Sequence, residues 1–321
     1  MKRRRSSRIS LVVAAAASLL TLQGCATISD KSPEDQEQRY IEELQKSGKL
    51  EDRLAALELR SRGRLGFAIM DSGGVMIAGY RAQERFAMCS TFKMILAAQT
   101  LRQAELRKLP LRRRISYGAQ DLLEYAPVVK SHFDESTGKG VMTVEQLARA
   151  SVVESDNSAA NLLLGQLGGP AGLTEYIRTQ GDLVTRLDRI EPALNENGIS
   201  DPRDTTSPAA MVALTHKLLL GKRALRYSSR QKLISWLIAS PTGADRLRAG
   251  LPEGWMGGSK SGSCGNAVND VAIAWDDDNN PLILAVFLDR PGKGDAESKK
   301  TLADVAALVT GKNLPSPVAP K

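Results

Sequence analysis

The fold class is decided by residues 65–80, LGFAIMDSGGVMIAGY. Two apolar runs, Leu65–Met70 and Val75–Tyr80, are separated by Asp-Ser-Gly-Gly, whose glycines supply the backbone dihedrals of a turn. This pattern predicts an antiparallel β-hairpin. A second hairpin is predicted over Val271–Trp275 and Pro281–Leu288, on either side of a turn rich in Asp and Asn.

Helices should pack against the sheet that these hairpins form. Leucines at i, i+4 and i+7 from Leu50 predict an amphipathic helix before the first hairpin. The segment Thr301–Val309, rich in Ala, Leu and Val, predicts another that ends at a glycine cap, Gly311. Because the hairpins come from opposite ends of the chain, we expect an α/β (α+β) sandwich, an antiparallel sheet flanked by helices, over residues 49–84 and 237–312.

The middle of the chain, residues 85–236, is dominated by helical patterns and predicts an inserted all-α domain. Within it, Asp188 to Pro208 is irregular and long for a loop in a compact domain. Such loops are usually functional. Residues 313–321 are expected to form a tail.

Composition limits the class of protein. The 321 residues, 42% of them hydrophobic, suit a globular protein and exclude collagen-like, coiled-coil and disordered chains. The net charge is +8, but five positive charges and no acid stand before Cys25, which leaves +3 for the rest. With only 4% aromatic residues, and with Arg112–Arg114 interpreted as a solvated face, we expect no nucleic-acid partner.

The N-terminal residues predict export. A basic start precedes the apolar run Ile9–Leu22, which is too short to span a bilayer but is typical of a secretory signal. Residues 1–24 are therefore predicted to be a signal peptide, and the protein to be periplasmic. Residues 22–25 resemble a lipobox, in which Cys25 would be acylated as a membrane anchor; ordinary cleavage after the next residue is the alternative. The polar residues 25–48 predict a tether.

Several classes of chemistry are poorly supported. His132 and His216 are the only histidines, and no His or Cys spacing suits zinc. A Ser-His-Asp site lacks support, and no Gly-Lys pair is followed by Ser or Thr, so a P-loop is absent. We expect neither a metal nor another cofactor. A hydrolase in this chain would need Lys or Glu as its base.

Ser90-Thr91-Phe92-Lys93 offers such a base at the start of a helix-forming run. The i, i+3 spacing puts the hydroxyl and the amine on one face. Burial would lower the pKa of the lysine, so that a neutral amine could deprotonate Ser90 while a backbone N–H at the helix start stabilises an oxyanion. The alternative is an N-cap serine followed by a solvated lysine.

Two further motifs are weak singly. Ser155-Asp156-Asn157 precedes an apolar helix, where all three residue types also favour N-caps. Lys260-Ser261-Gly262 lies in a strand-like segment, where the lysine could be an exposed edge residue. Together the three motifs resemble the serine β-lactamase and penicillin-binding protein superfamily. Residues 186–204 resemble the omega loop of class A β-lactamases, and the resemblance extends from about Leu50 to Val309.

The class A resemblance implies catalytic roles. Ser90 would be the nucleophile, and the Ser155 hydroxyl would pass a proton to the leaving nitrogen, assisted by Lys260. Two candidates for the acylation base stay open, Lys93 and Glu191 acting through water.

The omega loop would supply the residues that hydrolyse the acyl-enzyme. Glu191 and Asn195 would hold a water over the acyl-enzyme carbonyl, with the carboxylate taking its proton and the amide fixing its position. The resemblance also implies an ion pair between Arg189 and Asp204 that joins the two ends of the loop, and a cis bond before Pro192.

Substrate contacts follow from the same resemblance. Ser261 and Ser263 fall where the family binds the substrate carboxylate and supplies the second oxyanion N–H. Asn157 would contact the acylamide side chain. Tyr125 matches the aromatic residue at the entrance of the site, although an ordinary half-buried tyrosine is the alternative.

Some features resemble the carbapenem-hydrolysing members in particular. Cys89 and Cys264 fall at two positions that are linked by a disulfide in those enzymes, and export makes such a bond chemically reasonable. Arg246 falls where several of them place a guanidinium that holds the substrate carboxylate, a role that suits its planar fork. Arg248 is the nearby competitor.

The expected function is hydrolysis of the β-lactam amide of penicillins and cephalosporins, with carbapenems as a further hypothesis, through a serine acyl-enzyme, and hence antibiotic resistance. One alternative is a penicillin-binding D-alanyl-D-alanine peptidase, which Glu191 and Asn195 disfavour. The other is a non-catalytic cell-wall-binding lipoprotein, which would not need the Ser, Lys and Glu sets together. Small β-lactams are the expected partners, and a monomer is the family expectation.

Overall fold

A computed structural model describes residues 32–265 and 267–311. Within the described residues the chain divides after Tyr40, and the second unit begins at Ile41. The predicted signal peptide, Cys25 and the predicted tail lie outside the described residues. Helix α1 (Pro33–Lys46) occupies much of the segment that we predicted to be a polar tether. No helix in the described ranges is long and apolar enough to cross a membrane.

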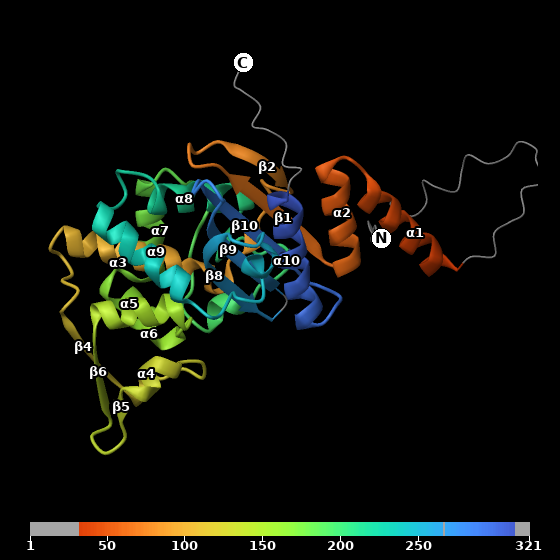
Figure 1. Ribbon diagram of the computed structural model, residues 1–321. Coiled ribbons are helices and arrows are strands. Elements are labelled where there is room, and N and C mark those ends of the chain that lie inside the picture. Colours follow the sequence, from red (N-terminus) through yellow and green to blue (C-terminus); the bar gives the residue numbers. More distant parts are fainter. Residues whose placement is uncertain (1–31, 266, 312–321) are drawn as a thin grey trace, which may run out of the picture. The chain divides into compact units, whose positions relative to one another are not determined.

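A five-stranded antiparallel sheet, in the order β2-β1-β10-β9-β8, joins the two ends of the chain (Figure 1). Both predicted hairpins are confirmed. Strand β1 pairs with β10, so that Phe67 lies opposite Val286. The strands are β1 (Arg64–Met70), β2 (Met76–Tyr80), β8 (Met256–Cys264), β9 (Ala267–Trp275) and β10 (Pro281–Asp289).

Each face of the sheet packs on its own core. In β1, Phe67 and Ile69 point to the core shared with helices α2 (Leu50–Ser61) and α10 (Asp295–Thr310), whereas Ala68 points to the core of the helical insertion. This alternation is the strand period of two residues. The prediction of an antiparallel sheet flanked by helices is therefore confirmed.

The C-terminal helix differs from its prediction at both ends. It begins at Asp295 rather than at Thr301, because its first turns are polar and carry little hydrophobic periodicity. Gly311 follows the last helical residue as predicted, but its backbone is extended, with φ −67° and ψ 169°. The left-handed conformation expected of a glycine cap is therefore absent at this residue.

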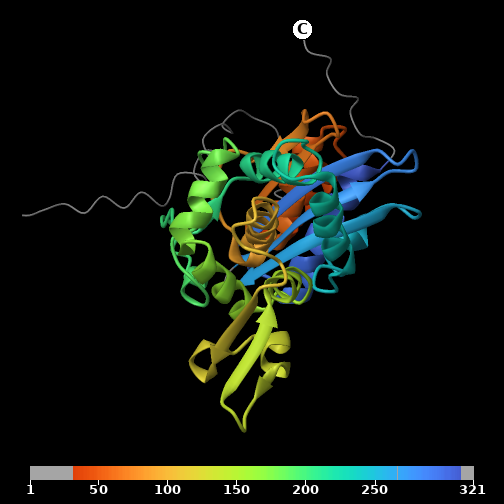
Figure 2. The same ribbon diagram turned by 90° about the vertical axis from the view of Figure 1, so that its left-hand side faces the viewer.

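The insertion between the hairpins is mainly helical, and α3 runs through its centre, where Figure 2 shows it end-on. Ten consecutive residues of α3, Phe92–Leu101, are buried. The helices are α3 (Phe92–Glu105), α4 (Pro127–Ser131), α5 (Val144–Val153), α6 (Asn157–Gln166), α7 (Gly169–Thr179), α8 (Pro208–Leu219) and α9 (Tyr227–Ala239).

Two small sheets in the insertion were not predicted. Strands β4, β6 and β5 form an antiparallel sheet at the edge of the insertion (Figures 1 and 2), and β3 pairs with β7. The strands have five residues or fewer, too short for a clear alternation of polar and apolar side chains. They are β3 (Phe86–Ala87), β4 (Arg114–Gly118), β5 (Phe133–Asp134), β6 (Lys139–Thr143) and β7 (Thr205–Thr206).

Candidate active site

Ser90 lies in a single 3-10 turn, Cys89–Thr91, that leads directly into α3. Lys93 follows three residues later, and its Nζ donates a hydrogen bond of 3.1 Å to Ser90 Oγ. The side chain of Lys93 has no exposed surface, which excludes the alternative of a solvated lysine. The hydroxyl and the amine thus meet on one face of the helix start.

Lys93 connects its own motif to the Ser155-Asp156-Asn157 motif and to the omega loop. Its Nζ donates 2.8 Å to the backbone oxygen of Ser155 and also donates to Asn157 Oδ1. The same nitrogen lies 3.0 Å from Glu191 Oε1, and both side chains of this ion pair are fully buried. Burial lowers the pKa of Lys93, and the negative charge of Glu191 opposes that shift.

Glu191 is held by two asparagines. The Asn195 side chain donates 2.6 Å to Glu191 Oε2. Asn161 Nδ2 donates 2.8 Å to the Glu191 backbone oxygen, and Asn161 Oδ1 accepts 3.0 Å from the Glu191 N–H. Asn161 was not among the predicted site residues. The only signal in the sequence was its place one helical turn after Asn157 on α6, where both side chains share a face.

The omega loop is closed by the predicted ion pair. Arg189 Nε donates 2.6 Å to Asp204 Oδ2, and Asp204 Oδ1 also accepts from the backbone N–H groups of Asp188 and Arg189. The peptide bond between Glu191 and Pro192 is cis, as the resemblance implied. The ends of the loop are therefore fixed on each other, and the segment that carries Glu191 lies between them.

Ser155 and Lys260 meet across the two halves of the fold. Ser155 has a left-handed backbone, φ 58°, at the start of α6, and its Oγ accepts 3.0 Å from Lys260 Nζ. Lys260 also donates 2.9 Å to the Ser261 backbone oxygen. Burial is the main cause that lowers the pKa of Lys260 well below its usual range, and the positive charge of Lys93 adds to it. The alternative of an exposed edge lysine is wrong.

Asp156 is the helix cap that the alternative interpretation expected. Its Oδ1 accepts 2.8 Å from the Ala159 N–H, and its Oδ2 accepts 2.9 Å from both Val128 and Val129 N–H groups. Beside it, the Asn157 N–H donates 3.0 Å to the backbone oxygen of Tyr125. This places Tyr125 next to the site with 52% of its surface exposed.

Arg246 lies at the other end of the site and is buried. Its guanidinium donates 2.7 Å to Ser263 Oγ, 2.9 Å to the Gly262 backbone oxygen and 2.7 Å to that of Asn269. Arg248 instead donates to the backbone oxygens of Ile238 and Ser240. Of the two candidates, only Arg246 contacts a predicted substrate-binding residue.

A chain of hydroxyls that the sequence did not indicate supports Ser261. Ser261 Oγ donates 2.8 Å to Thr242 Oγ1, which lies 3.0 Å from Ser240 Oγ. Ser240 Oγ in turn donates 2.8 Å to the Val153 backbone oxygen at the end of α5. These contacts link strand β8 to the helical insertion beside Ser155.

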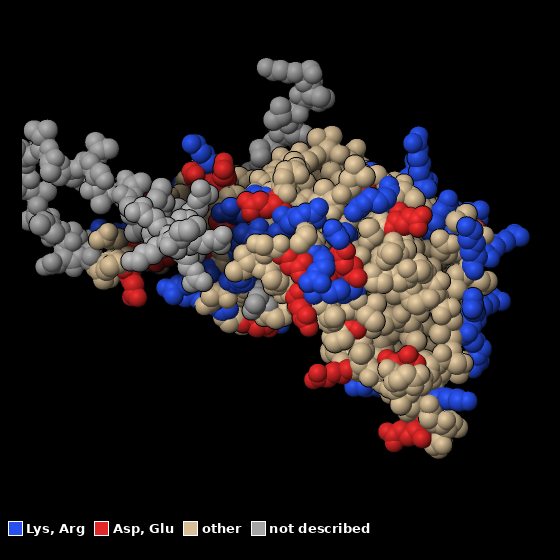
Figure 3. All heavy atoms as spheres, turned by 180° about the vertical axis from the view of Figure 1, so that it is seen from behind, with Lys and Arg blue, Asp and Glu red and all other residues tan. Residues whose placement is uncertain are grey.

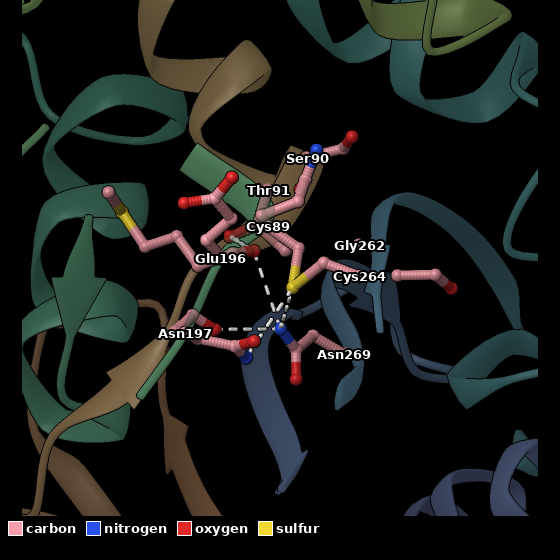
Figure 4. The surroundings of a disulfide bond; sticks show 12 residues. Cys89, Ser90, Thr91, Glu196, Asn197, Gly262, Cys264 and Asn269 are labelled. Carbon is pink, nitrogen blue, oxygen red and sulfur yellow. Dashed lines mark hydrogen bonds between the residues drawn. A yellow bond between two sulfur atoms is a disulfide. The ribbon is translucent and has the colours of Figure 1, made fainter. Parts of the chain in front are cut away.

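The predicted disulfide between Cys89 and Cys264 is present, with 5.6 Å between the Cα atoms. Figure 4 shows that Ser90 adjoins this bond and that Asn269 reaches Cys89 Sγ, at 3.6 Å. The bond joins positions 175 residues apart, so it ties the turn that carries Ser90 to strand β8.

The double variant Cys89→Ser/Cys264→Ser is expected to lose about 2–5 kcal/mol of unfolding free energy, because the unfolded chain is no longer cross-linked over a long loop. Urea unfolding monitored by circular dichroism measures this. As the control, reductant should lower the stability of the wild type and leave that of the double variant unchanged. Equal midpoints for the oxidised wild type and the variant would contradict the expectation.

Asp270 is a buried carboxyl that sequence reasoning missed, because it stands among the apolar residues of β9. Its Oδ2 accepts 3.3 Å from the Leu247 N–H, close to Arg246 in the chain. Burial raises the pKa of Asp270 to about 6, against the lowering effect of the positive charge of Arg246.

Asp270 should therefore make the stability depend on pH. Its carboxyl binds a proton more tightly in the folded than in the unfolded state, so its stabilising contribution is complete below about pH 4 and is lost as the pH rises towards 6. The unfolding free energy of Asp270→Asn, relative to wild type, should rise by about 3 kcal/mol between pH 3.5 and pH 7. Urea unfolding across this range measures it, and a difference that does not change with pH would contradict it.

Comparisons with known proteins agree with this geometry. Residues 49–312 match the family model described as the β-lactamase enzyme family. The chain is 41% identical over 262 residues to β-lactamase CTX-M-8 of Citrobacter amalonaticus, covering 81% of this chain and 88% of the relative. It is 44% identical over 256 residues to β-lactamase L2 of Stenotrophomonas maltophilia, covering 79% and 82%.

Solved structures show the same likeness. An ancestral class A β-lactamase superposes with a TM-score of 0.77 at 48% identity, over 81% of this chain and 98% of the other. A β-lactamase from Xanthomonas campestris pv. campestris gives a TM-score of 0.77 at 42% identity, over 82% and 98%. The similarity thus extends over the sheet and the helical insertion together.

Proposed function

We propose, from the premise that the chain belongs to class A of the β-lactamase enzyme family, that Ser90 and Glu191 carry its reaction in two steps, acylation and hydrolysis. The protein is an enzyme that hydrolyses β-lactams and so acts in antibiotic resistance. The relatives are β-lactamases, and the alternatives of a peptidase and of a non-catalytic lipoprotein are dropped.

In the first step, Ser90 Oγ attacks the β-lactam carbonyl carbon and its proton passes to a base. Lys93, hydrogen-bonded to Ser90 at 3.1 Å, is one candidate, and Glu191 acting through water is the other. The bond between the carbonyl carbon and the ring nitrogen then breaks. The Ser155 hydroxyl gives that nitrogen its proton and is resupplied through Lys260, from which it accepts at 3.0 Å.

In the second step, a water held by Glu191 and Asn195 attacks the ester carbonyl. One proton of the water passes to the Glu191 carboxylate, its oxygen bonds to the carbonyl carbon, and Ser90 leaves and is reprotonated. The observation that carries the proposal is the buried ion pair between Lys93 and Glu191, since it brings the carboxylate of a distant loop to the amine that contacts Ser90. A carboxylate at that place is within reach of the groups that both steps need.

For substrate binding, we propose that Arg246, Ser261 and Ser263 hold the carboxylate common to penicillins, cephalosporins and carbapenems, and that carbapenems are among the substrates. Asn157 would bind the acylamide side chain and Tyr125 would line the entrance. The buried, planar guanidinium of Arg246 on Ser263 supports this assignment, because it presents charged donors to a carboxylate.

Arg246→Ala should raise KM at least about 10-fold for a penicillin, a cephalosporin and a carbapenem, because a charged hydrogen bond to the carboxylate is lost, with a smaller effect on kcat. Spectrophotometric assays with purified enzyme measure both constants. Arg248→Ala is the matched control and should leave KM within about 2-fold. A larger rise in KM for Arg248→Ala than for Arg246→Ala would transfer the role to Arg248.

We also propose that the enzyme is exported to the periplasm as a monomer, with Cys25 as a candidate lipid anchor. The domain division into residues 49–84 with 237–312 and residues 85–236 is likewise proposed. The basic and apolar residues before Cys25 support export. Labelling with a fatty-acid precursor tests the anchor, since cleavage after Ala26 would leave the protein unlabelled.

A further inference from the structure

Positive charge is concentrated at one edge of the helical insertion, which we call the basic face and define as residues 102–114 and 222–232. The first segment carries six Lys and Arg residues with one acid, and the second carries five with none. They adjoin, because the Arg226 N–H donates 2.7 Å to Glu105 Oε1. Figure 3 shows Lys and Arg side chains gathered along this edge of the body.

The rest of the chain does not share this positive charge. The chain after Cys25 has a net charge of +3, of which the basic face contributes +10, so the remainder carries −7. In the described ranges, Arg102 pairs with Glu105 and Lys232 with Glu145, whereas Lys108, for example, makes no ion pair. The other members without an ion pair there are Arg107, Arg112, Arg113, Arg114, Lys222, Arg223, Arg226 and Arg230.

Two large apolar side chains are exposed within this positive surface. Leu106 is 45% exposed and Tyr227 is 69% exposed. Leu106 follows Glu105 in the chain, and Tyr227 follows Arg226. Because Glu105 and Arg226 are joined by a hydrogen bond, Leu106 and Tyr227 lie close together. Protein segments that rest in the interfacial layer of a membrane typically combine exposed aromatic and apolar residues with surrounding Arg and Lys.

A hollow of about 730 Å³ lies beside Leu106, between α3 and α7. Arg102 and Arg223 line it, together with one acidic residue, Glu175. Its lining also includes Tyr176 and Gln99, whose hydroxyl and amide oxygen are buried and have no hydrogen-bond partner among the described residues. Guanidinium and phenol groups can donate to phosphate oxygens, and the amide oxygen can accept from a hydroxyl group. The two guanidinium groups at the hollow suit the phosphate of a phospholipid headgroup.

We propose that the basic face is a docking surface for a bilayer that contains anionic phospholipid, with phosphate headgroups on its arginines and lysines and with Leu106 and Tyr227 in the interfacial layer. Nucleic acid offers phosphates but no apolar layer for these two side chains, so the bilayer is favoured. None of the proposed catalytic or substrate-binding residues belongs to the basic face. The docking is therefore independent of β-lactam hydrolysis.

The test is co-sedimentation of the exported protein with vesicles of phosphatidylcholine, with and without phosphatidylglycerol. The chain carries Cys25→Ala, so that no acyl chain contributes. Binding is expected only to the phosphatidylglycerol vesicles and should weaken at least about 10-fold in Lys108→Glu/Arg112→Glu/Arg113→Glu. Lys49→Glu/Arg53→Glu/Lys293→Glu, which changes the net charge equally outside the basic face, should weaken it less than about 3-fold.

Leu106→Ser/Tyr227→Ser tests the apolar contact without changing charge and should weaken vesicle binding several-fold. All variants should keep the wild-type rate of β-lactam hydrolysis, which shows that they fold. Equal binding to both kinds of vesicle, or equal losses in the two charge variants, would overturn the proposal. A third outcome would also overturn the proposal: Leu106→Ser/Tyr227→Ser binds vesicles as the wild type does, and the wild type binds duplex DNA tightly. That outcome would assign the surface to nucleic acid.

Discussion

The Glu191→Gln variant is expected to turn over a penicillin about 10²–10⁴-fold more slowly than the wild type, the contribution typical of a general base. Glutamine keeps the size of the side chain, and its amide oxygen can still accept from Asn195 Nδ2, which donates 2.6 Å to Glu191 in the wild type. It cannot take a proton from water. Ser90 should therefore become acylated and stay so, and steady-state assays of substrate loss measure the effect.

The matched control is Glu196→Gln, on the same loop, whose side chain is 81% exposed. It should hydrolyse substrate at the wild-type rate. A stopped-flow trace of Glu191→Gln also separates the two candidate bases. A fast first turnover followed by arrest assigns acylation to Lys93, whereas a slowed first turnover assigns it to Glu191. Wild-type turnover by Glu191→Gln would remove Glu191 from the mechanism.

Lys93→Met should lower both activity and stability. It removes the cation of a fully buried ion pair and leaves the Glu191 carboxylate without that charge. Breaking such a pair by removing one partner costs about 3–5 kcal/mol of unfolding free energy. Acylation should slow by at least about 10²-fold, because Ser90 loses the amine hydrogen-bonded to it. Urea unfolding and acylation rates measure the two losses.

The double variant Lys93→Met/Glu191→Gln separates these losses. Removing the charge of the unpaired carboxylate should restore the unfolding free energy to within about 1 kcal/mol of wild type. Replacing both partners of a buried ion pair by uncharged residues often leaves stability unchanged. Activity should not return. Lys222→Met, at an exposed lysine, is the control for the substitution itself. Additive losses of stability in the double variant would show that the two side chains are not coupled.

The sheet could be predicted because its strands carry their own signals. The runs that form β1 and β10 are apolar and bounded by turn residues, and their place at opposite chain ends indicated a shared sheet. Chain order alone could not give the pairing of Phe67 with Val286. Strands β4, β5 and β6 escaped prediction because short, half-polar strands resemble loops.

The side chains that meet at the site came partly from residue chemistry and partly from the class A resemblance. The spacing of Ser90 and Lys93 indicated their contact directly. The local sequence could not show that Lys260, on an edge strand, is buried, because its cover includes Ser155 from the helical insertion. For the same reason Asp270 passed as an ordinary strand residue, and Asn161 as a polar position on a helix.

The central claim is that Ser90 forms an ester with the opened β-lactam and that Glu191 enables water to cleave it. The most direct test is intact-mass spectrometry of Glu191→Gln mixed with excess penicillin, beside the double variant Ser90→Gly/Glu191→Gln. The account predicts a stable adduct of the substrate's full mass on Ser90 in the first and none in the second. Unmodified Glu191→Gln throughout substrate consumption, or an adduct that survives the loss of Ser90, would contradict it.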